Sequence, residues 1–252
     1  MTISCNLEGK VIFVTGATSG FGQHFARTLA ASGASVAMTG RRSERLEQLE
    51  AEIEGRDGRA LGIVMDVMDS DSIKNAIEVA ETELGPINVL VNNAGISRDN
   101  LAVNIPEEDY DAVLDTNLKG PFLLAQEIGR RMIERGKGGS IINVGSMVAY
   151  RAFRGLSTYA MSKAGMVAMT RSLALEWARY NINVNTICPG YVETEMNSEY
   201  FNSEKGKAVV AKFPGKALGK LEDLDGILLL LASDSSAFIT GATIEVDGGQ
   251  PL

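Results

Sequence analysis

Cysteine and histidine are scarce in this sequence, and long apolar runs are missing. Cys5 and Cys188 are the only cysteines and His24 is the only histidine among 252 residues. This is too little for a disulfide framework, and metal-ligand spacing is lacking, so we expect neither a metal site nor a zinc-dependent alcohol dehydrogenase. The apolar run at 227–232 is far shorter than the roughly 20 residues of a membrane span, and it predicts a buried helix.

Basic charge is also in short supply. The chain has 24 Lys and Arg against 32 Asp and Glu, which gives a formal net charge of −8. No basic cluster is interleaved with aromatic residues, so we expect no nucleic-acid partner. The first ten residues include Asn6 and Glu8 and lack the pattern of a secretory signal, so we expect a cytoplasmic protein without a membrane anchor.

Short β-branched runs alternate with segments of helical period along the whole chain. This order predicts βαβ units in an α/β, Rossmann-type doubly wound fold, with a seven-stranded parallel sheet flanked by helices. No linker or repeat interrupts it, so residues 1–252 are expected to form a single dinucleotide-binding catalytic domain. The predicted strands are 10–15, 35–39, 60–65, 88–92, 140–144, 183–188 and 243–246.

Two local features add to this prediction. Ser43 has the residue type and position of an N-cap for the helix that follows the second strand. Residues 191–218, after the sixth strand, are polar and irregular. Ligands of open α/β sheets bind beyond the carboxyl ends of the strands, so this segment is predicted to be a substrate lid, with a plain surface excursion as the alternative.

The first strand is followed by glycines at positions 16, 20 and 22 and then by a helix. Glycines in this context allow a backbone to approach a pyrophosphate, whose charge is met by amide groups and the positive end of the helix. The second strand leads into Arg41 and Arg42, with no carboxylate at the strand end. Arginine at this place suits a 2′-phosphate, which predicts NADP rather than NAD; the alternative is that both arginines are simply solvated.

Tyr159 and Lys163 stand four residues apart, one helical turn on the same face. An ammonium lowers the pKa of a nearby phenol, so the pair predicts an acid-base centre for a carbonyl or alcohol. Ser146, just after the fifth strand, is placed to hydrogen-bond the substrate oxygen, although alone it would be read as a cap. Asn117 lies in a helical pattern, where either a functional or a buried, satisfied side chain fits.

Together these motifs resemble those of short-chain dehydrogenases/reductases over essentially the whole chain. The motifs that carry the resemblance are Thr15-Gly16-x-x-x-Gly20-x-Gly22, Asp66-Val67, Asn92-Asn93-Ala94-Gly95, Asn117, Ser146, Tyr159-x-x-x-Lys163 and Pro189-Gly190. The resemblance implies hydride transfer, a homotetramer, and a catalytic tetrad of Asn117, Ser146, Tyr159 and Lys163. In that tetrad Lys163 would also bind the nicotinamide ribose, and Asn117 would hold a water of the proton relay.

The predicted cofactor site draws on the same motifs. Ser19 stands where many NADP-preferring relatives carry a basic residue, so the NADP prediction depends on the two arginines alone. The residues expected to contact NADP, or NAD as the alternative, are Gly16, Thr18, Ser19, Gly20, Phe21, Gly22, Arg41, Arg42, Asp66, Val67, Asn93, Gly95, Tyr159, Lys163, Pro189, Gly190, Val192 and Thr194.

The substrate, a small carbonyl or alcohol, is left open by the sequence. Residues 95–101 and 239–249 are similar to those of 3-oxoacyl-[acyl-carrier-protein] reductases, but Tyr180 stands where those enzymes carry a basic residue. Residues 189–196 are similar to those of polyol and sugar-acid dehydrogenases, and a non-catalytic dinucleotide sensor would have lost the four catalytic residue types present here. The expected pocket residues are Ser97, Met147, Ala149, Arg151, Phe153, Arg154, Tyr191 and Met196.

Overall fold

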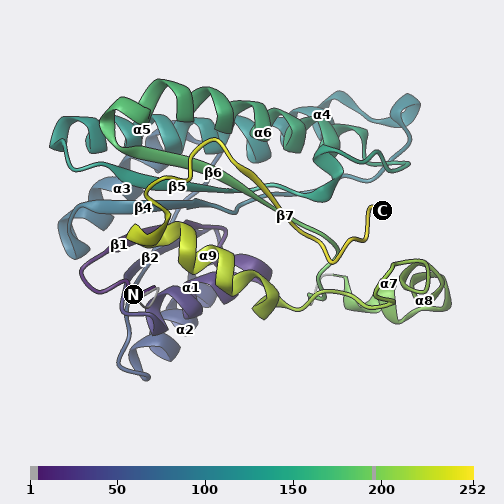
Figure 1. Cartoon of the computed structure of the whole chain (residues 1–252), viewed down its shortest axis with the longest axis horizontal. Helices are drawn as coiled ribbons and strands as arrows, with labels where there is room; N and C mark the ends of the chain where they lie inside the picture. Colours follow the sequence, from purple (N-terminus) through teal and green to yellow (C-terminus); the bar gives the residue numbers. More distant parts are fainter. Residues whose placement is uncertain (1–4, 195–196) are drawn as a thin grey trace.

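The computed structural model describes residues 5–194 and 197–252, which fold around one parallel sheet of seven strands. The strand order is β3-β2-β1-β4-β5-β6-β7, so the chain moves outward from β1 in one direction and from β4 in the other (Figure 1). This confirms the predicted single-domain Rossmann-type fold. The strands are β1 (Val11–Thr15), β2 (Ser35–Gly40), β3 (Arg59–Val64), β4 (Ile87–Asn92), β5 (Gly139–Val144), β6 (Ile182–Pro189) and β7 (Thr243–Val246).

Helices cover both faces of the sheet and bury their apolar stripes on it (Figure 1). Phe25 and Leu228 belong to the core between the sheet and α1, α2 and α9, whereas Ile77 and Met166 belong to the core beneath α3, α5 and α6. None of the described helices is long and apolar enough to cross a membrane. The α-helices are α1 (Gly20–Ala31), α2 (Ser43–Glu54), α3 (Ser70–Leu84), α4 (Glu107–Leu114), α5 (Gly120–Arg135), α6 (Ser157–Trp177), α7 (Ser198–Asn202), α8 (Glu204–Val210) and α9 (Asp225–Ala232).

The predicted strands agree with the observed ones to within one residue at each end, because buried β-branched runs mark them clearly. The prediction that Ser43 caps its helix is wrong. Strand β2 continues to Gly40, which pairs with Val64, so only two residues remain before the helix. Arg42 takes the extended cap conformation, without a side-chain capping bond, and Ser43 becomes the first helical residue.

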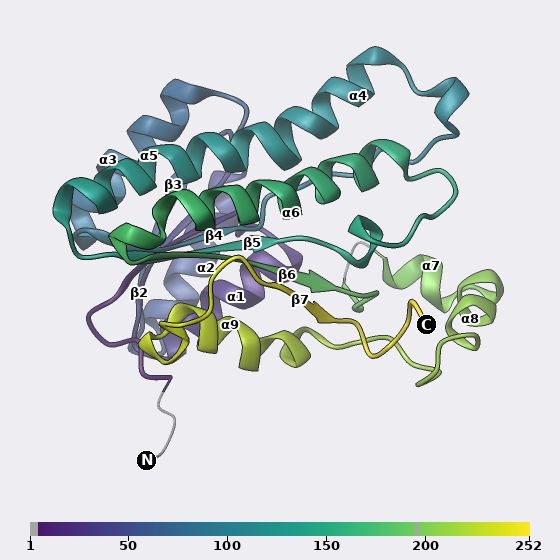
Figure 2. The same cartoon turned by 45° about the horizontal axis from the view of Figure 1, so that its top comes forward.

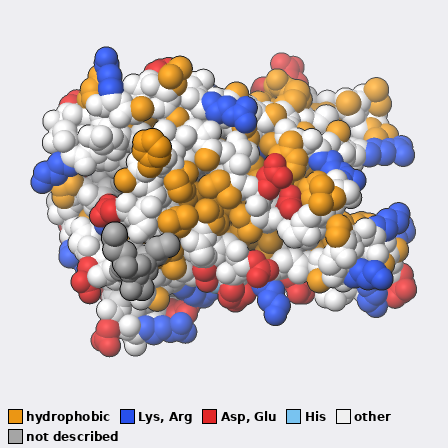
Figure 3. All heavy atoms as spheres, in the orientation of Figure 1, with side chains coloured by type: hydrophobic (Ala, Val, Ile, Leu, Met, Phe, Trp, Pro, Cys, Tyr) orange, Lys and Arg blue, Asp and Glu red, His pale blue; other side chains and the backbone are white. Residues whose placement is uncertain are grey.

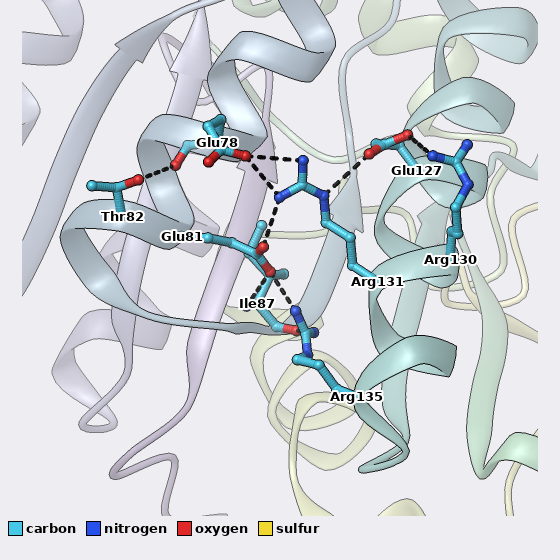
Figure 4. Close-up of polar contacts among 8 residues, drawn as sticks. All are labelled: Glu78, Glu81, Thr82, Ile87, Glu127, Arg130, Arg131 and Arg135. Atoms are coloured by element: carbon cyan, nitrogen blue, oxygen red, sulfur yellow. Dashed lines mark hydrogen bonds and ion pairs between the residues drawn. The ribbon is translucent and has the colours of Figure 1, made fainter.

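The amino edge of the sheet carries a cluster of ion pairs between α3 and α5 (Figure 4). Arg131 donates hydrogen bonds to Glu78, Glu81 and Glu127, with its Nη1 2.8 Å from Glu81 Oε2. Arg135 bonds both Glu81 and the carbonyl oxygen of Ile87, at the start of β4. The cluster therefore fixes both helices to the edge opposite the one where functional loops are expected.

The carboxyl edge of the sheet gathers the loops that follow β1, β4, β5 and β6. Strands β1 and β4 are neighbours whose chains leave in opposite directions, which opens a crevice suited to ligands. Helices α7 and α8 lie at this edge, and the C-terminus lies beside them in both views (Figures 1 and 2).

Candidate active site

The loop between β1 and α1 is shaped by close backbone contacts. A Cβ at Gly16 would lie 2.8 Å from Ala94 Cα, and one at Gly22 would lie 2.4 Å from Gly16 O, so a side chain at either position would collide with the fold. Helix α1 begins after Ser19 without a side-chain capping bond and has no acidic residue in its first turn. Its first amide groups are consequently available to an anion. Phe21 lies in that first turn and stacks on Phe25 at 6.0 Å.

Arg42 reaches from the end of β2 across this loop. Its Nε lies 3.0 Å from Thr18 Oγ1, and its Nη2 lies 2.9 Å from Ser19 Oγ. Arg41 is exposed and makes no hydrogen bond or ion pair with the residues that the structure describes. Of the two arginines singled out from the sequence, Arg42 alone is joined to the glycine loop.

The loop after β4 is attached to the loop after β1. Asn93 Nδ2 donates to the carbonyl oxygen of Thr15 at 2.8 Å, and Thr15 Oγ1 accepts from the backbone N–H groups of Asn93 and Ala94 at 3.0 and 2.9 Å. Thr15 was assigned no role from the sequence, although its place at the end of an apolar strand was a usable signal. A Cβ at Gly95 would lie 3.3 Å from Asn117 Oδ1 and 3.6 Å from Lys163 Nζ, so this loop also meets the acid-base residues.

Asp66 and Val67 follow β3 at the same edge. The Asp66 carboxylate accepts a hydrogen bond from Met68 N at 3.0 Å and closes a local turn, while its own N–H donates to Ser72 Oγ. Val67 is 9% exposed and packs in the core beneath α3 and α5. Both residues therefore lie at the carboxyl edge of the sheet, and Val67 has little open surface.

Asn117 is fully buried in a short π-helix, η2 (Asp115–Lys119), between α4 and α5. Its Oδ1 accepts from Ile96 N at 2.8 Å, and its Nδ2 donates to Ile96 O at 2.8 Å and to Ser162 Oγ at 3.1 Å. Asn117 is therefore a satisfied side chain that pins the loop after β4 to α6. The sequence did not predict the π-helix, a form that occurs often at functional sites.

Ser146 lies close enough to the Tyr159 phenol to affect its pKa. Ser146 is the N-cap of a short 3-10 helix, η3 (Met147–Ala149), and accepts from Val148 N at 3.3 Å, which confirms that it acts as a cap. Burial raises the pKa of Tyr159 to about 12, and the hydrogen bond with Ser146 acts in the opposite direction. The negative charge of Asp99 raises it further. The predicted lowering of this pKa is wrong here, because burial outweighs the other effects.

Lys163 lies beneath the tyrosine. It is 3% exposed, its Nζ donates to Val144 O at 2.7 Å, and the same nitrogen lies 5.6 Å from the centre of the Tyr159 ring. Burial lowers the pKa of Lys163 to about 8, so the side chain is still mostly an ammonium at pH 7. The fully buried thiol of Cys188, behind this group, was not expected from the sequence, which shows only a lone cysteine in a strand.

The chain leaves β6 through Pro189 and Gly190 and then turns back on itself. Val192 is buried and forms a parallel bridge with Gly219, whose N–H donates to Tyr191 O at 3.0 Å. Thr194 is half-buried, and its N–H donates to Asn197 Oδ1 at 2.9 Å. The two ends of the 191–218 segment are therefore held together at the sheet edge.

Aromatic rings make up the wall beyond Ser146 and Tyr159. Tyr191 meets Phe153 edge-on at 6.0 Å and Phe201 at 5.3 Å, and it stacks on Phe213 at 5.9 Å. In the space-filling view, a hollow lies between the end of the molecule that carries α7 and α8 and the part above it that carries α4. Lys and Arg side chains lie on both sides of this hollow (Figure 3).

The remaining pocket residues differ in how open they are. Ser97 is exposed and hydrogen-bonds Asp99, Ala149 is half-buried, and Met147 is almost fully buried. Met196 lies outside the described residues. Asp99 was passed over in the sequence, where nothing marks it apart from other surface acids. Within the described residues no group of three or more His, Cys, Asp and Glu side chains could hold a metal ion.

Comparison with known proteins identifies the relatives of this arrangement. Residues 10–205 match the model of the short chain dehydrogenase family. This chain belongs to that family. The 3-oxoacyl-[acyl-carrier-protein] reductase of Thermotoga maritima is 42% identical over 96% of this chain and 98% of its own length.

Other members of the short chain dehydrogenase family point to a second chemistry. The 2-dehydro-3-deoxy-D-gluconate 5-dehydrogenase of Dickeya dadantii is 36% identical, over 97% of this chain and 96% of its own. The gluconate 5-dehydrogenase structure from Burkholderia cenocepacia, a complex with NADP and tartrate, is 33% identical and superposes with a TM-score of 0.93, covering 98% of this chain and 97% of that one. The present protein is an NAD(P)-dependent oxidoreductase of this family.

The residues present fit a dinucleotide. The uncapped start of α1, the glycine positions without room for a Cβ, and the guanidinium of Arg42 beside Thr18 together offer amide donors, close approach and positive charge. These are the features that a pyrophosphate and a 2′-phosphate require.

Proposed function

We propose that this oxidoreductase is an NADP-preferring carbonyl reductase in which Tyr159 delivers the proton. The bound cofactor supplies the hydride to the carbonyl carbon. The proximity of the Ser146 side chain to the Tyr159 phenol carries the proposal, because both hydroxyl groups can hydrogen-bond one carbonyl oxygen as negative charge develops on it. With a pKa of about 12, Tyr159 is fully protonated at neutral pH and is ready to act as the acid.

Lys163 would stabilise the phenolate that remains. Its ammonium lies 5.6 Å from the ring centre, in a buried setting where an electrostatic interaction is stronger than in water. Asn117 would act on the loop that carries Ile96 and so fix the path by which Tyr159 regains its proton. The family resemblance adds that Lys163 would hold the nicotinamide ribose and Asn117 a relay water.

NADP, rather than NAD, is proposed from the position of Arg42. Its guanidinium donates hydrogen bonds to the hydroxyl groups of Thr18 and Ser19 and therefore places a positive charge beside that loop. A 2′-phosphate there would gain charge-assisted hydrogen bonds from arginine, threonine and serine. The remaining cofactor contacts are proposed as they were predicted from the sequence.

The first candidate substrate is a 3-oxoacyl thioester. The wall made by Phe153, Tyr191 and Phe213 offers apolar surface that an acyl chain would bury and a polyhydroxylated chain would not. The second candidate is a keto sugar acid, favoured by the exposed guanidinium groups of Arg151 and Arg154 beside Phe153, which suit a carboxylate.

The deciding experiment measures NADPH oxidation with acetoacetyl thioesters, keto sugar acids and uncharged ketones. Turnover of thioesters with little turnover of the others would support the first candidate, and the reverse pattern would support the second. A Tyr159→Phe variant that binds NADPH normally but turns over at least a thousandfold more slowly is expected in every case. Wild-type turnover by this variant would refute the role given to Tyr159.

We further propose that the enzyme is a cytoplasmic homotetramer that pairs its long helices. Phe122 on α5 and Leu175 on α6 are exposed apolar side chains, as is Phe238 before β7. Apolar side chains exposed on such helices are typical of surfaces that associate. Light scattering after size-exclusion chromatography would test this, and a mass near 27 kDa, the mass of one chain, would contradict it.

A further inference from the structure

The last described residues form a tight turn at the carboxyl edge of the sheet. We call residues 247–250 the C-terminal turn. Gly248 and Gly249 have positive φ angles of 58° and 73°, and Asp247 accepts hydrogen bonds from the N–H groups of both Gly249 and Gln250, through Oδ1 and its carbonyl oxygen. This turn reverses the chain after β7 and sends the Gln250 side chain back toward the end of β6.

Gln250 is 9% exposed and uses both ends of its amide on one backbone unit. Its Oε1 accepts from Tyr191 N at 2.6 Å, and its Nε2 donates to Tyr191 O at 3.1 Å. The Tyr191 carbonyl also accepts from Gly219 N. A Cβ at Gly190 would lie 2.6 Å from Gln250 Oε1, so this contact leaves no room for a side chain at position 190. The backbone of Tyr191 is consequently held on both sides.

The Tyr191 ring passes this constraint to the substrate wall. It contacts the rings of Phe153, Phe201 and Phe213. A shift of the Tyr191 backbone would therefore move the ring that joins the loop after β5 to α7. Displacements of about 1 Å in positioning groups can change rates by as much as about a hundredfold.

The C-terminal turn also holds the opposite side of the site. Asp247 Oδ2 accepts a hydrogen bond from the Tyr150 hydroxyl at 2.8 Å. Tyr150 directly follows η3, whose N-cap is Ser146. One turn of the chain thus attaches both to the Tyr191 segment and to the loop that carries Ser146.

We propose that Gln250 is a positioning residue that sets the substrate wall of the site by clamping the Tyr191 backbone. The proposal concerns the wall that would contact substrate and rests on the proposed carbonyl reduction. Neither the glycine loop nor Arg42 contacts Gln250 in the described hydrogen bonds, so the phosphate-binding end of the proposed cofactor site should be independent of it.

The test compares Gln250→Met, which keeps the length of the side chain and loses both hydrogen bonds, with Gln250→Glu, which keeps an acceptor for Tyr191 N only. We expect KM for the ketone to rise at least tenfold in Gln250→Met and by at least as much in Gln250→Glu, whose carboxylate sets an oxygen against the Tyr191 carbonyl. The Kd for adenosine 2′,5′-bisphosphate, which would occupy only the Arg42 end of the cofactor site, should stay within twofold in both. Gln48→Met, at an exposed position on α2, is the matched control and should behave as wild type.

A second readout does not depend on turnover. Trypsin cleavage after Lys207 and Lys212 should be faster in Gln250→Met than in wild type and in Gln48→Met, because the 191–218 segment loses one attachment. Unchanged KM together with unchanged cleavage in Gln250→Met would overturn the proposal. If Gln250→Met does not fold, Gln250→Glu, which loses the hydrogen bond to Tyr191 O, answers the same question. Failure of the proposed carbonyl reduction would show instead as full activity in Tyr159→Phe. The comparison of trypsin cleavage would still test the role of Gln250 in that case.

Discussion

Arg42 donates hydrogen bonds to the hydroxyl groups of both Thr18 and Ser19, although it stands more than twenty residues later in the chain. The resemblance noted from the sequence implies a basic residue at the position of Ser19 in many NADP-preferring relatives, and here a positive charge comes from the residue that precedes α2 instead. The two solutions put positive charge at the same part of the glycine loop.

Arg42→Ala should weaken the preference for NADPH. Loss of hydrogen bonds between a guanidinium and a phosphate removes about 1.5 to 3 kcal/mol, so kcat/KM for NADPH should fall roughly tenfold to a hundredfold. The value for NADH should change by less than about threefold. Steady-state kinetics with both cofactors would measure this, with Arg130→Ala, on α5 at the opposite edge of the sheet, as control. An equal fall for both cofactors would contradict the assignment.

Cofactor binding should weaken in alkaline solution because of Lys163. Burial lowers the pKa of this group to about 8, so it is an ammonium below that pH and neutral above it. The Kd for NADPH, measured by fluorescence, should therefore rise as pH increases through about 8. Lys163→Met should bind more weakly at pH 7 and show a flat profile over the same range. A flat wild-type profile would show that the charge of Lys163 does not contribute to NADPH binding.

The same group should affect stability in the opposite direction. Lysine in the unfolded chain has a pKa of 10.5, so between about 8 and 10.5 the unfolded state binds more protons than the folded state. The free energy of unfolding should therefore increase as pH rises through that window, which means that the folded state becomes more stable. Urea denaturation at pH 7 and 9.5 would measure it, and the gain should be absent from Lys163→Met.

Asp99→Asn should change the pH profile of alcohol oxidation, in which Tyr159 must lose its proton. Burial is the main reason that the pKa of Tyr159 is raised to about 12, and the carboxylate of Asp99 adds to it. Removing that charge should lower the pKa, so the alkaline rise in kcat/KM should begin at lower pH. Asparagine can still accept the hydrogen bond from Ser97. Glu47→Gln, exposed on α2, should leave the profile unchanged.

Arg131→Ala should reduce stability without affecting the chemistry. Burial alone would raise the pKa of Glu81, yet hydrogen bonds from Arg131, the Ile87 N–H and Arg135 hold it below its usual value. Loss of Arg131 leaves these acids poorly compensated and should cost about 2 kcal/mol in the free energy of unfolding. Arg130→Ala, which removes a single exposed ion pair with Glu127, should cost under about 1 kcal/mol. A large change in kcat for Arg131→Ala would contradict the separation of this cluster from the site.

The parts of the fold that were predictable from sequence are those set by local pattern. Buried β-branched runs located the strands, and glycines 16 and 22 proved to be places where a Cβ would collide. The predicted N-cap of α2 was wrong because the position of the cap follows from the length of β2, and that length depends on pairing with β3. Local sequence carries little of that information.

The parts of the site that were missed depend on distant segments meeting. The raised pKa of Tyr159 reflects how much of the chain covers the phenol, which a spacing of four residues does not describe. Gln250 gave no signal because its two partners belong to a residue 59 positions earlier. Asn117 gave a weak signal in the sequence. Its two hydrogen bonds to the Ile96 backbone depend on the meeting of two segments about twenty residues apart.

The ion-pair cluster of Arg131 lies at one edge of the sheet, whereas the loops of the site lie at the other (Figures 1 and 4). A strand here spans four to eight residues between the two edges. The protein can therefore gain or lose thermal tolerance through substitutions at one end while keeping its chemistry at the other. Adaptation to temperature and adaptation to a new substrate need not compete for the same residues in this chain.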